Sequence, residues 1–200
     1  MAMFKLKNQQ SYNRRKSILS KMEKLKDQEI SCAACSGKCC TSVANSMQCS
    51  PLEAMEILNW LKEKNLWHQE MKQKLDNCIR DYRLDYEIPT SRGLPLRRTY
   101  TCPFFNHGPK GCLLSRTIKP YGCLAFNPKS KKISNGEDCI SDILLLGQRD
   151  NDWNEFEKLK NDEIKLSLSL DWDKLPMPIA LLDLDKKYSV DKKTNKRERC

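Results

Sequence analysis

The sequence predicts a mainly α-helical, single small domain in which an irregular, cysteine-rich segment binds metal between helices, with room for one short β-hairpin. Three observations indicate this class. A length of 200 residues suits one domain. Long stretches repeat apolar residues at helical spacing. Eight of the eleven cysteines gather in segments that lack this spacing, and grouped thiolates are what zinc and iron–sulfur clusters require.

The first element is a basic N-terminal helix or arm, residues 1–30. Within it, residues 11–30 are expected to be helical because Ile18, Met22 and Leu25 recur at the spacing of one helix face. Residues 1–30 carry eight Lys or Arg and three Asp or Glu residues, a net charge of +5. We therefore expect an amphipathic helix with a solvated basic side.

A second helix is predicted to begin at Ser50. Serine can cap a helix, Pro51 suits the first helical position, and Glu53 completes a capping box. The helix is expected to run to about Lys64. Further helices are predicted over residues 66–87 and 140–165.

Residues 88–140 change in character, because prolines, glycines and turn dipeptides become frequent. Short strands are expected near Arg97–Thr101 and Gly111–Leu114, on either side of a turn at residues 106–111. The metal-binding domain as a whole is assigned to residues 31–184.

The last part of the chain is predicted to be extended and then flexible. Leu175–Leu184 is apolar but contains two prolines, which favours an extended arm over a helix. Residues 185–200 hold seven basic and three acidic residues, which indicates a basic flexible tail.

The net charge of +10 is concentrated at the two ends, which leaves only +1 for the middle. No basic groove surrounds the cysteines and no aromatic residues alternate with basic ones, so nucleic acid is not an expected partner. The longest aliphatic run, residues 143–146, is too short to span a bilayer, and we expect no membrane insertion. Without a signal-like apolar stretch at the start, the protein is expected to be cytoplasmic, where thiols stay reduced.

The first cysteine group combines a CxxC pair, Cys32 and Cys35, with the adjacent Cys39 and Cys40. A CxxC pair lets two sulfurs bind one metal. Neighbouring side chains diverge, so the adjacent pair suits two ions or two irons of a cluster. The eight grouped cysteines would fill two tetrahedral zinc sites, or they would hold one 4Fe-4S cluster and leave spare thiols. The predicted metal ligands are Cys32, Cys35, Cys39, Cys40, Cys102, Cys112, Cys123 and Cys139.

The order of these motifs resembles the CxxCxxCC family of zinc- or iron-chelating, YkgJ-type cysteine-cluster proteins. The resemblance covers roughly residues 32–140. The chain departs from the family pattern at four places. Three residues rather than two precede the adjacent cysteines, and Leu113-Leu114 stands where the family has Ile-Tyr. Lys119 and Leu124 stand where the family has arginine. The motifs that carry the resemblance are Cys32-x2-Cys35-x3-Cys39-Cys40, Cys102-Pro103-Phe104-Phe105, Gly111-Cys112 and Lys119-Pro120-x2-Cys123.

The resemblance implies metal or iron–sulfur binding, with a redox role if the centre is a cluster. Because one branch of the family resembles flagellin lysine N-methylases, an S-adenosylmethionine-dependent enzyme or its accessory is a second hypothesis. A zinc-stabilised interaction module, whose basic ends recruit an unknown protein partner, is a third. The residues alone do not separate zinc from an iron–sulfur cluster.

Overall fold

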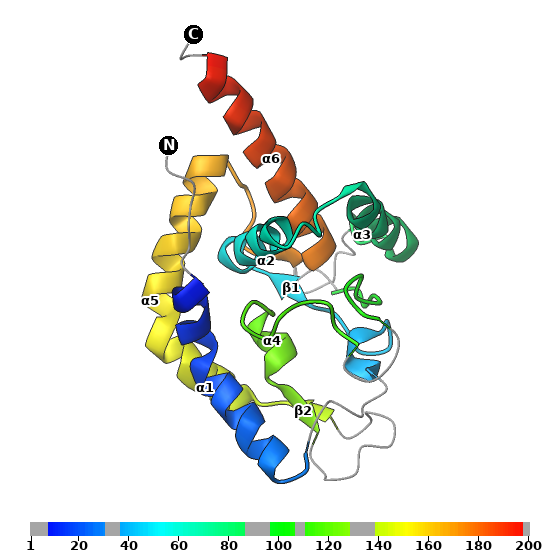
Figure 1. The fold of residues 1–200 in the computed structure, drawn as a ribbon, viewed down its shortest axis with the longest axis vertical. Helices are drawn as coiled ribbons and strands as arrows, with labels where there is room; N and C mark the ends of the chain where they lie inside the picture. The colour runs from blue at the N-terminus through cyan, green and yellow to red at the C-terminus, as the bar shows by residue number, and fades with distance from the viewer. Residues whose placement is uncertain (1–7, 31–36, 87–96, 107–110, 129–138, 198–200) are drawn as a thin grey trace, which may run out of the picture. The chain divides into compact units, whose positions relative to one another are not determined.

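The computed structural model describes residues 8–30, 37–86, 97–106, 111–128 and 139–197. The predicted class is confirmed, because the chain is a mainly helical, single small domain with small two-stranded sheets (Figure 1). Its residues group into two compact units, Met1–Met47 with Thr99–Asn154 and Gln48–Arg98 with Glu155–Cys200. Among the described residues, no helix combines the length and apolar character needed to span a bilayer.

The first unit is built around the N-terminal helix, which confirms the helix predicted over residues 11–30. Ile18 is fully buried and packs with Tyr121, Leu124 and Ala125. Leu19, Met22, Leu145 and Leu146 pack around this cluster. The elements of the unit are α1 (Asn8–Asp27), the 3-10 helix η2 (Lys38–Cys40), α4 (Tyr121–Leu124), β2 (Phe126–Pro128), β3 (Cys139–Ser141) and the first part of α5 (Ile143–Leu168). Because α1 packs on α4, it belongs to the core of this unit.

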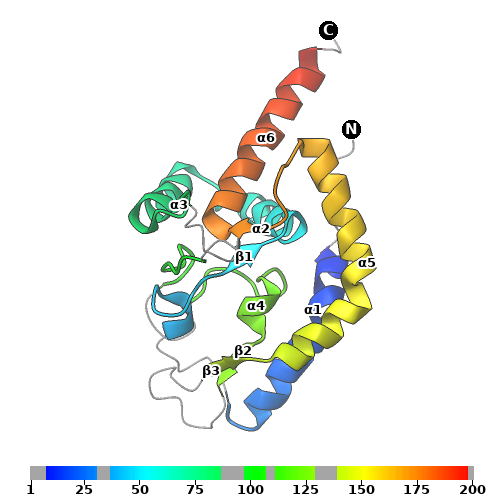
Figure 2. The ribbon, with the colours of Figure 1, turned by 180° about the vertical axis from the view of Figure 1, so that it is seen from behind.

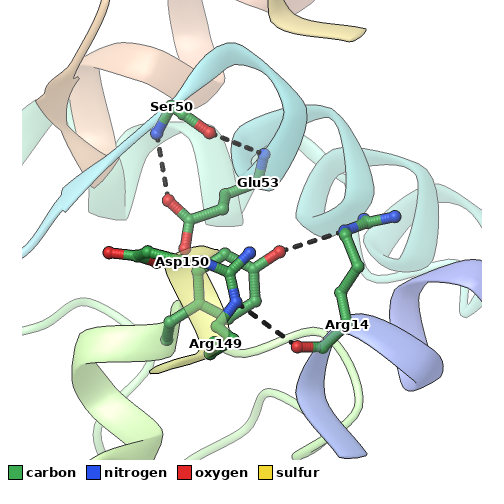
Figure 3. Close-up of polar contacts among 6 residues, drawn as sticks. Arg14, Ser50, Glu53, Arg149 and Asp150 are labelled. Carbon is green, nitrogen blue, oxygen red and sulfur yellow. Dashed lines mark hydrogen bonds and ion pairs between the residues drawn. The ribbon is translucent and has the colours of Figure 1, made fainter. Parts of the chain in front are cut away.

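The second unit begins with the predicted capping box. The Ser50 hydroxyl accepts a hydrogen bond from the Glu53 amide at 3.3 Å, and the Glu53 carboxylate accepts one from the Ser50 amide at 3.1 Å (Figure 3). The helix that follows, α2 (Pro51–Glu63), starts where the sequence predicted. The other elements are β1 (Gln48–Cys49), α3 (Gln69–Tyr82), the rest of α5, β4 (Leu175–Pro176) and α6 (Met177–Arg197).

Helix α6 holds the second unit together, since both α2 and α3 pack against it (Figure 2). Asp185 of α6 forms ion pairs with Lys62 at 2.6 Å and with Lys72 at 2.8 Å. The carboxylate is largely buried, with 12% of its side chain exposed. One acidic residue thus joins three helices.

The prediction of an extended arm over Leu175–Leu184 is wrong. Only Leu175 and Pro176 are extended, in β4, and α6 begins at Met177. Pro178 lies in the first turn, where the amide that proline lacks has no intrahelical partner. The helix then continues through Arg197 into the segment assigned to a flexible tail.

The predicted hairpin is shorter than expected and consists of a single bridge. Phe105 and Cys112 form an isolated antiparallel bridge, and the Leu113 amide donates to the Phe104 carbonyl at 2.9 Å. The strand expected at Arg97–Thr101 is wrong, because this segment has no strand assignment. Residues 107–110 of the predicted turn lie outside the described residues. Two antiparallel sheets were not predicted, β1 with β4 and β2 with β3.

The helices predicted over residues 66–87 and 140–165 are confirmed as α3 and α5. Helix α3 is shorter than predicted at both ends. The His68 imidazole caps its start by accepting from the Met71 amide at 3.4 Å, and Arg83 ends it in a left-handed conformation with φ 49°. A histidine cap and an arginine stop are weak signals in a sequence.

Candidate metal centre

A tight turn presents the two adjacent cysteines of the first group. Cys39 and Cys40 lie in η2, and Gly37, with φ 76°, caps the start of this helix. The Cys40 amide donates to the Gly37 carbonyl at 2.7 Å and closes the turn. A Cβ at position 37 would overlap the ring of Phe105, with only 2.5 Å to its Cζ atom. Glycine is therefore required here by both the backbone conformation and the contact.

The backbone brings Cys102 directly beside this turn. The Cys102 amide donates to the Cys40 carbonyl at 2.8 Å. Two further bonds hold the same segments together, since the Tyr100 amide donates to the Asn45 carbonyl and the Asn45 side chain donates to the Tyr100 carbonyl. Cysteines more than sixty residues apart in the sequence thus meet through main-chain hydrogen bonds.

Cys112 is placed by the short hairpin. The Phe105 amide donates to the Cys102 carbonyl at 3.0 Å, which turns the chain after Cys102. Phe105 then pairs with Cys112. Because Phe104 and Phe105 are both buried, this turn is anchored in the core.

Cys123 comes from a third segment, the short helix α4. Pro120 precedes this helix with φ −53° and ψ 144°, values compatible with the restricted φ of proline. The Cys123 amide donates to the Pro120 carbonyl at 3.0 Å. The cysteine is therefore held one helical turn after the proline.

The pKa of Cys123 is raised by burial and by the cysteines of the other two segments. Burial of its thiol raises the pKa of Cys123 well above the ordinary value, and the charges of Cys102, Cys112 and Cys39 raise it further. The Lys119 ammonium opposes this shift and lowers the pKa. These groups therefore lie close enough to Cys123 to act on its ionisation.

The pKa of Cys39 is also raised. The main cause is a hydrogen bond with the Cys40 side chain, followed by burial of the Cys39 thiol and the charge of Cys40. Thiols in this environment stay protonated at neutral pH, which makes them poor nucleophiles. A bound cation would reverse this preference, because it stabilises thiolates.

The predicted ligands fall into three groups in the structure. Cys39, Cys40, Cys102, Cys112 and Cys123 are brought together. Cys139 begins β3, where it lies opposite Pro128. Cys32 and Cys35 lie outside the described residues, so their prediction as ligands is not tested. Within the part of the chain that the structure describes, no three or more Cys, His, Asp or Glu side chains are already arranged to hold a metal ion.

Two cysteines outside the predicted ligand set are buried in the second unit. Cys49 is fully buried and Cys78 is 7% exposed. Burial, with a smaller contribution from Asp81, raises the pKa of Cys78 to about 11. These thiols serve as matched controls for those of the candidate centre.

Sequence reasoning missed a group of buried arginines beside Cys123. Arg14 and Arg15 of α1 are both fully buried, and Arg149 of α5 is 2% exposed. All three contact Tyr121, two residues before Cys123. The signal was present, since Arg14 and Arg15 share the apolar face that holds Ile18.

Comparisons with known proteins add no assignment. No family of known proteins, no curated protein and no solved structure matches this chain. The resemblance to the CxxCxxCC family therefore depends on the motif residues, and the function must be argued from the site.

Proposed function

We propose that this chain binds a metal centre, zinc or an iron–sulfur cluster, through cysteine thiolates grouped around Cys123. The observation that carries the proposal is the convergence of cysteines from three segments that are distant in the sequence. The hydrogen bond between Cys102 and Cys40 and the pairing of Phe105 with Cys112 support it. A cytoplasmic location, where such thiols remain reduced, is part of the proposal.

The donor set fits a thiophilic centre. Thiolates are soft ligands that select zinc and iron–sulfur clusters over hard ions such as Mg²⁺. Buried thiolates close to one another repel, and a cation removes this repulsion. Binding would release protons from thiols that are otherwise protonated. Cys32 and Cys35 are proposed to complete the ligand set, on the basis of their CxxC spacing.

The same electrostatics argue against a catalytic thiol. Reactive cysteines have a lowered pKa, which neighbouring positive charges or helix N-termini provide. Cys39 and Cys123 instead have raised pKa values. A zinc centre here would contribute folding energy, whereas a cluster would supply electron transfer.

The test is the metal and acid-labile sulfide content of anaerobically purified protein, with its visible absorption spectrum. Cys123→Ser is expected to reduce the bound metal to a small fraction of the wild-type amount. Cys78→Ser, which alters a buried thiol of the other unit, should leave the metal content unchanged.

The outcomes separate the two centres. Iron with equimolar sulfide and a brown colour would identify a cluster, and colourless protein with one or two zinc ions per chain would identify structural zinc. Wild-type protein that holds neither metal, and does not take one up when reconstituted, would overturn the proposal. Equal metal loss in Cys123→Ser and Cys78→Ser would also contradict it, because the loss would then reflect general destabilisation.

A further inference from the structure

One face of α1 binds the chain segment that leads into Cys123. The Ser11 hydroxyl donates to the Thr117 carbonyl at 2.9 Å. Arg15, one helical turn later, donates from Nε to the Lys119 carbonyl at 2.8 Å, and its Nη2 approaches the Ile118 carbonyl at 3.5 Å. Two side chains of one helix thus engage three consecutive carbonyl groups.

The two side chains are also fixed relative to each other. Arg15 Nη1 donates to the Ser11 hydroxyl at 2.8 Å and to the Ser11 carbonyl at 3.1 Å. Arg15 is fully buried and Ser11 is 3% exposed. Burial of a guanidinium is costly unless its donors are satisfied. The planar group of arginine is therefore held in a defined orientation against the carbonyls.

The held segment leads directly to the candidate ligand. Pro120 follows the last of the three carbonyls, and its restricted φ transmits their position to α4. Cys123 is bonded back to Pro120 within that helix. Few rotatable backbone bonds separate Lys119 from Cys123, so a shift of the carbonyls would move the thiol.

Arginine side chains hold α4 from a second direction, through the ring of Tyr121. The guanidinium carbon of Arg149 lies 3.3 Å from the ring centroid, and that of Arg15 lies 4.6 Å from it. Arg14 Nε donates to the Tyr121 hydroxyl at 3.1 Å. Arg149 in turn donates to the Arg14 carbonyl at 3.3 Å (Figure 3). Stacking of this kind restrains both the ring and the arginines.

We propose that Ser11 and Arg15 are positioning residues that control how firmly the centre retains its metal. This inference rests on the proposed metal-binding function. Docking of α1 fixes the carbonyls of residues 117–119, and these fix Cys123. Loss of the docking contacts leaves Cys123 free to move away from the metal, so the metal dissociates faster. The N-terminal helix is then a regulatory part of the site.

The experiment measures the rate at which metal passes from the full-length, loaded protein to excess chelator, well below the unfolding temperature. Pyridylazoresorcinol reports zinc and ferrozine reports iron. Arg15→Met keeps an apolar stem but removes all the donors. It is expected to release metal about 10–100-fold faster than the wild type, if the loss of affinity that follows removal of groups orienting metal ligands appears in the release rate. Arg15→Lys, which keeps the charge but not the planar fork, should lie between the two.

Lys16→Met provides a matched control, because Lys16 is exposed on the same helix. It should release metal at the wild-type rate. Asp185→Asn, which weakens the second unit, separates positioning from general loss of stability. If it accelerates release as much as Arg15→Met, the positioning role is wrong.

The remaining outcomes distinguish this inference from the proposed function. Wild-type protein without metal would overturn both. Loaded Arg15→Met that releases metal at the wild-type rate would overturn the positioning role alone. If Arg15→Met does not fold, Ser11→Ala serves in its place, since it removes the two bonds of the Ser11 hydroxyl, to the Thr117 carbonyl and from Arg15, but no charge. Ser11→Ala should then release metal several-fold faster, and an unchanged rate would refute the role of the docked face.

Discussion

Replacing Gly37 with alanine tests how the adjacent cysteines are presented. Gly37 combines a φ of 76° with close contact to the ring of Phe105. Alanine would add a Cβ in a conformation that side chains disfavour and in space that the ring occupies. Because Phe105 pairs with Cys112, movement of the ring would disturb two of the segments that carry cysteines.

The magnitude follows from two contributions. A left-handed conformation costs a non-glycine residue about 1–2 kcal/mol. Phe105 is only 6% exposed, so the ring must shift within a packed core, and overpacking of this kind costs about 1–3 kcal/mol. We expect Gly37→Ala to lower the free energy of unfolding by about 2–5 kcal/mol and to reduce the metal content.

The assay is urea unfolding of metal-free protein, followed by metal analysis of the loaded form. Gly147→Ala is the matched control, because Gly147 lies within α5. Apart from the backbone of the helix itself and the two chain neighbours, no atom lies within 4 Å of a Cβ added there. Alanine is favoured over glycine inside a helix by about 0.5–1 kcal/mol, so this variant should be more stable. If Gly37→Ala unfolds at or above the wild-type midpoint, the argument from the Phe105 contact is refuted.

Two further predictions concern the second unit. Burial raises the pKa of Asp185, but the bonds from Lys62 and Lys72 outweigh it and lower the pKa, so the ionised carboxylate stabilises the fold. Asp185→Asn should lower the free energy of unfolding by about 2 kcal/mol at pH 7. The difference from wild type should shrink as the pH falls below about 4, because the carboxylate is then protonated. Urea unfolding at several pH values measures this difference, and a constant difference would contradict the ion-pair argument. Ser50→Ala removes the hydroxyl that caps α2 and should cost about 1 kcal/mol by the same assay, whereas an unchanged midpoint would show that the cap contributes nothing.

The sequence predicts best where the signal is local. Ser50, Pro51 and Glu53 lie within four residues, and together they identify the start of α2 without any tertiary information. At Pro178 the prediction from the sequence was wrong, because an extended arm was expected and a helix is present. The same residue type ends a helix in its interior and is tolerated in its first turn, and only the position of β4 decides between these cases.

The candidate site was only partly predictable for the same reason. Cysteine spacing identifies which residues could act together, but not which distant segments meet. The bond between Cys102 and Cys40 depends on the pairing of Tyr100 with Asn45, and no short-range pattern encodes that pairing. The basic residues of the first helix were expected on a solvated side, but Arg14 and Arg15 are fully buried, which is rare for arginine.

Contacts within the protein position several cysteines of the first unit. Gly37 against Phe105 shapes the first turn, and backbone bonds join that turn to Cys102. The apolar cluster that contains Ile18 and Leu124 includes no cysteine. A small zinc finger lacks such a core and folds only on metal binding. The contacts of α1 with residues 117–119 are made by the protein alone, so their effect is expected in the rate of metal release as well as in the stability of the fold.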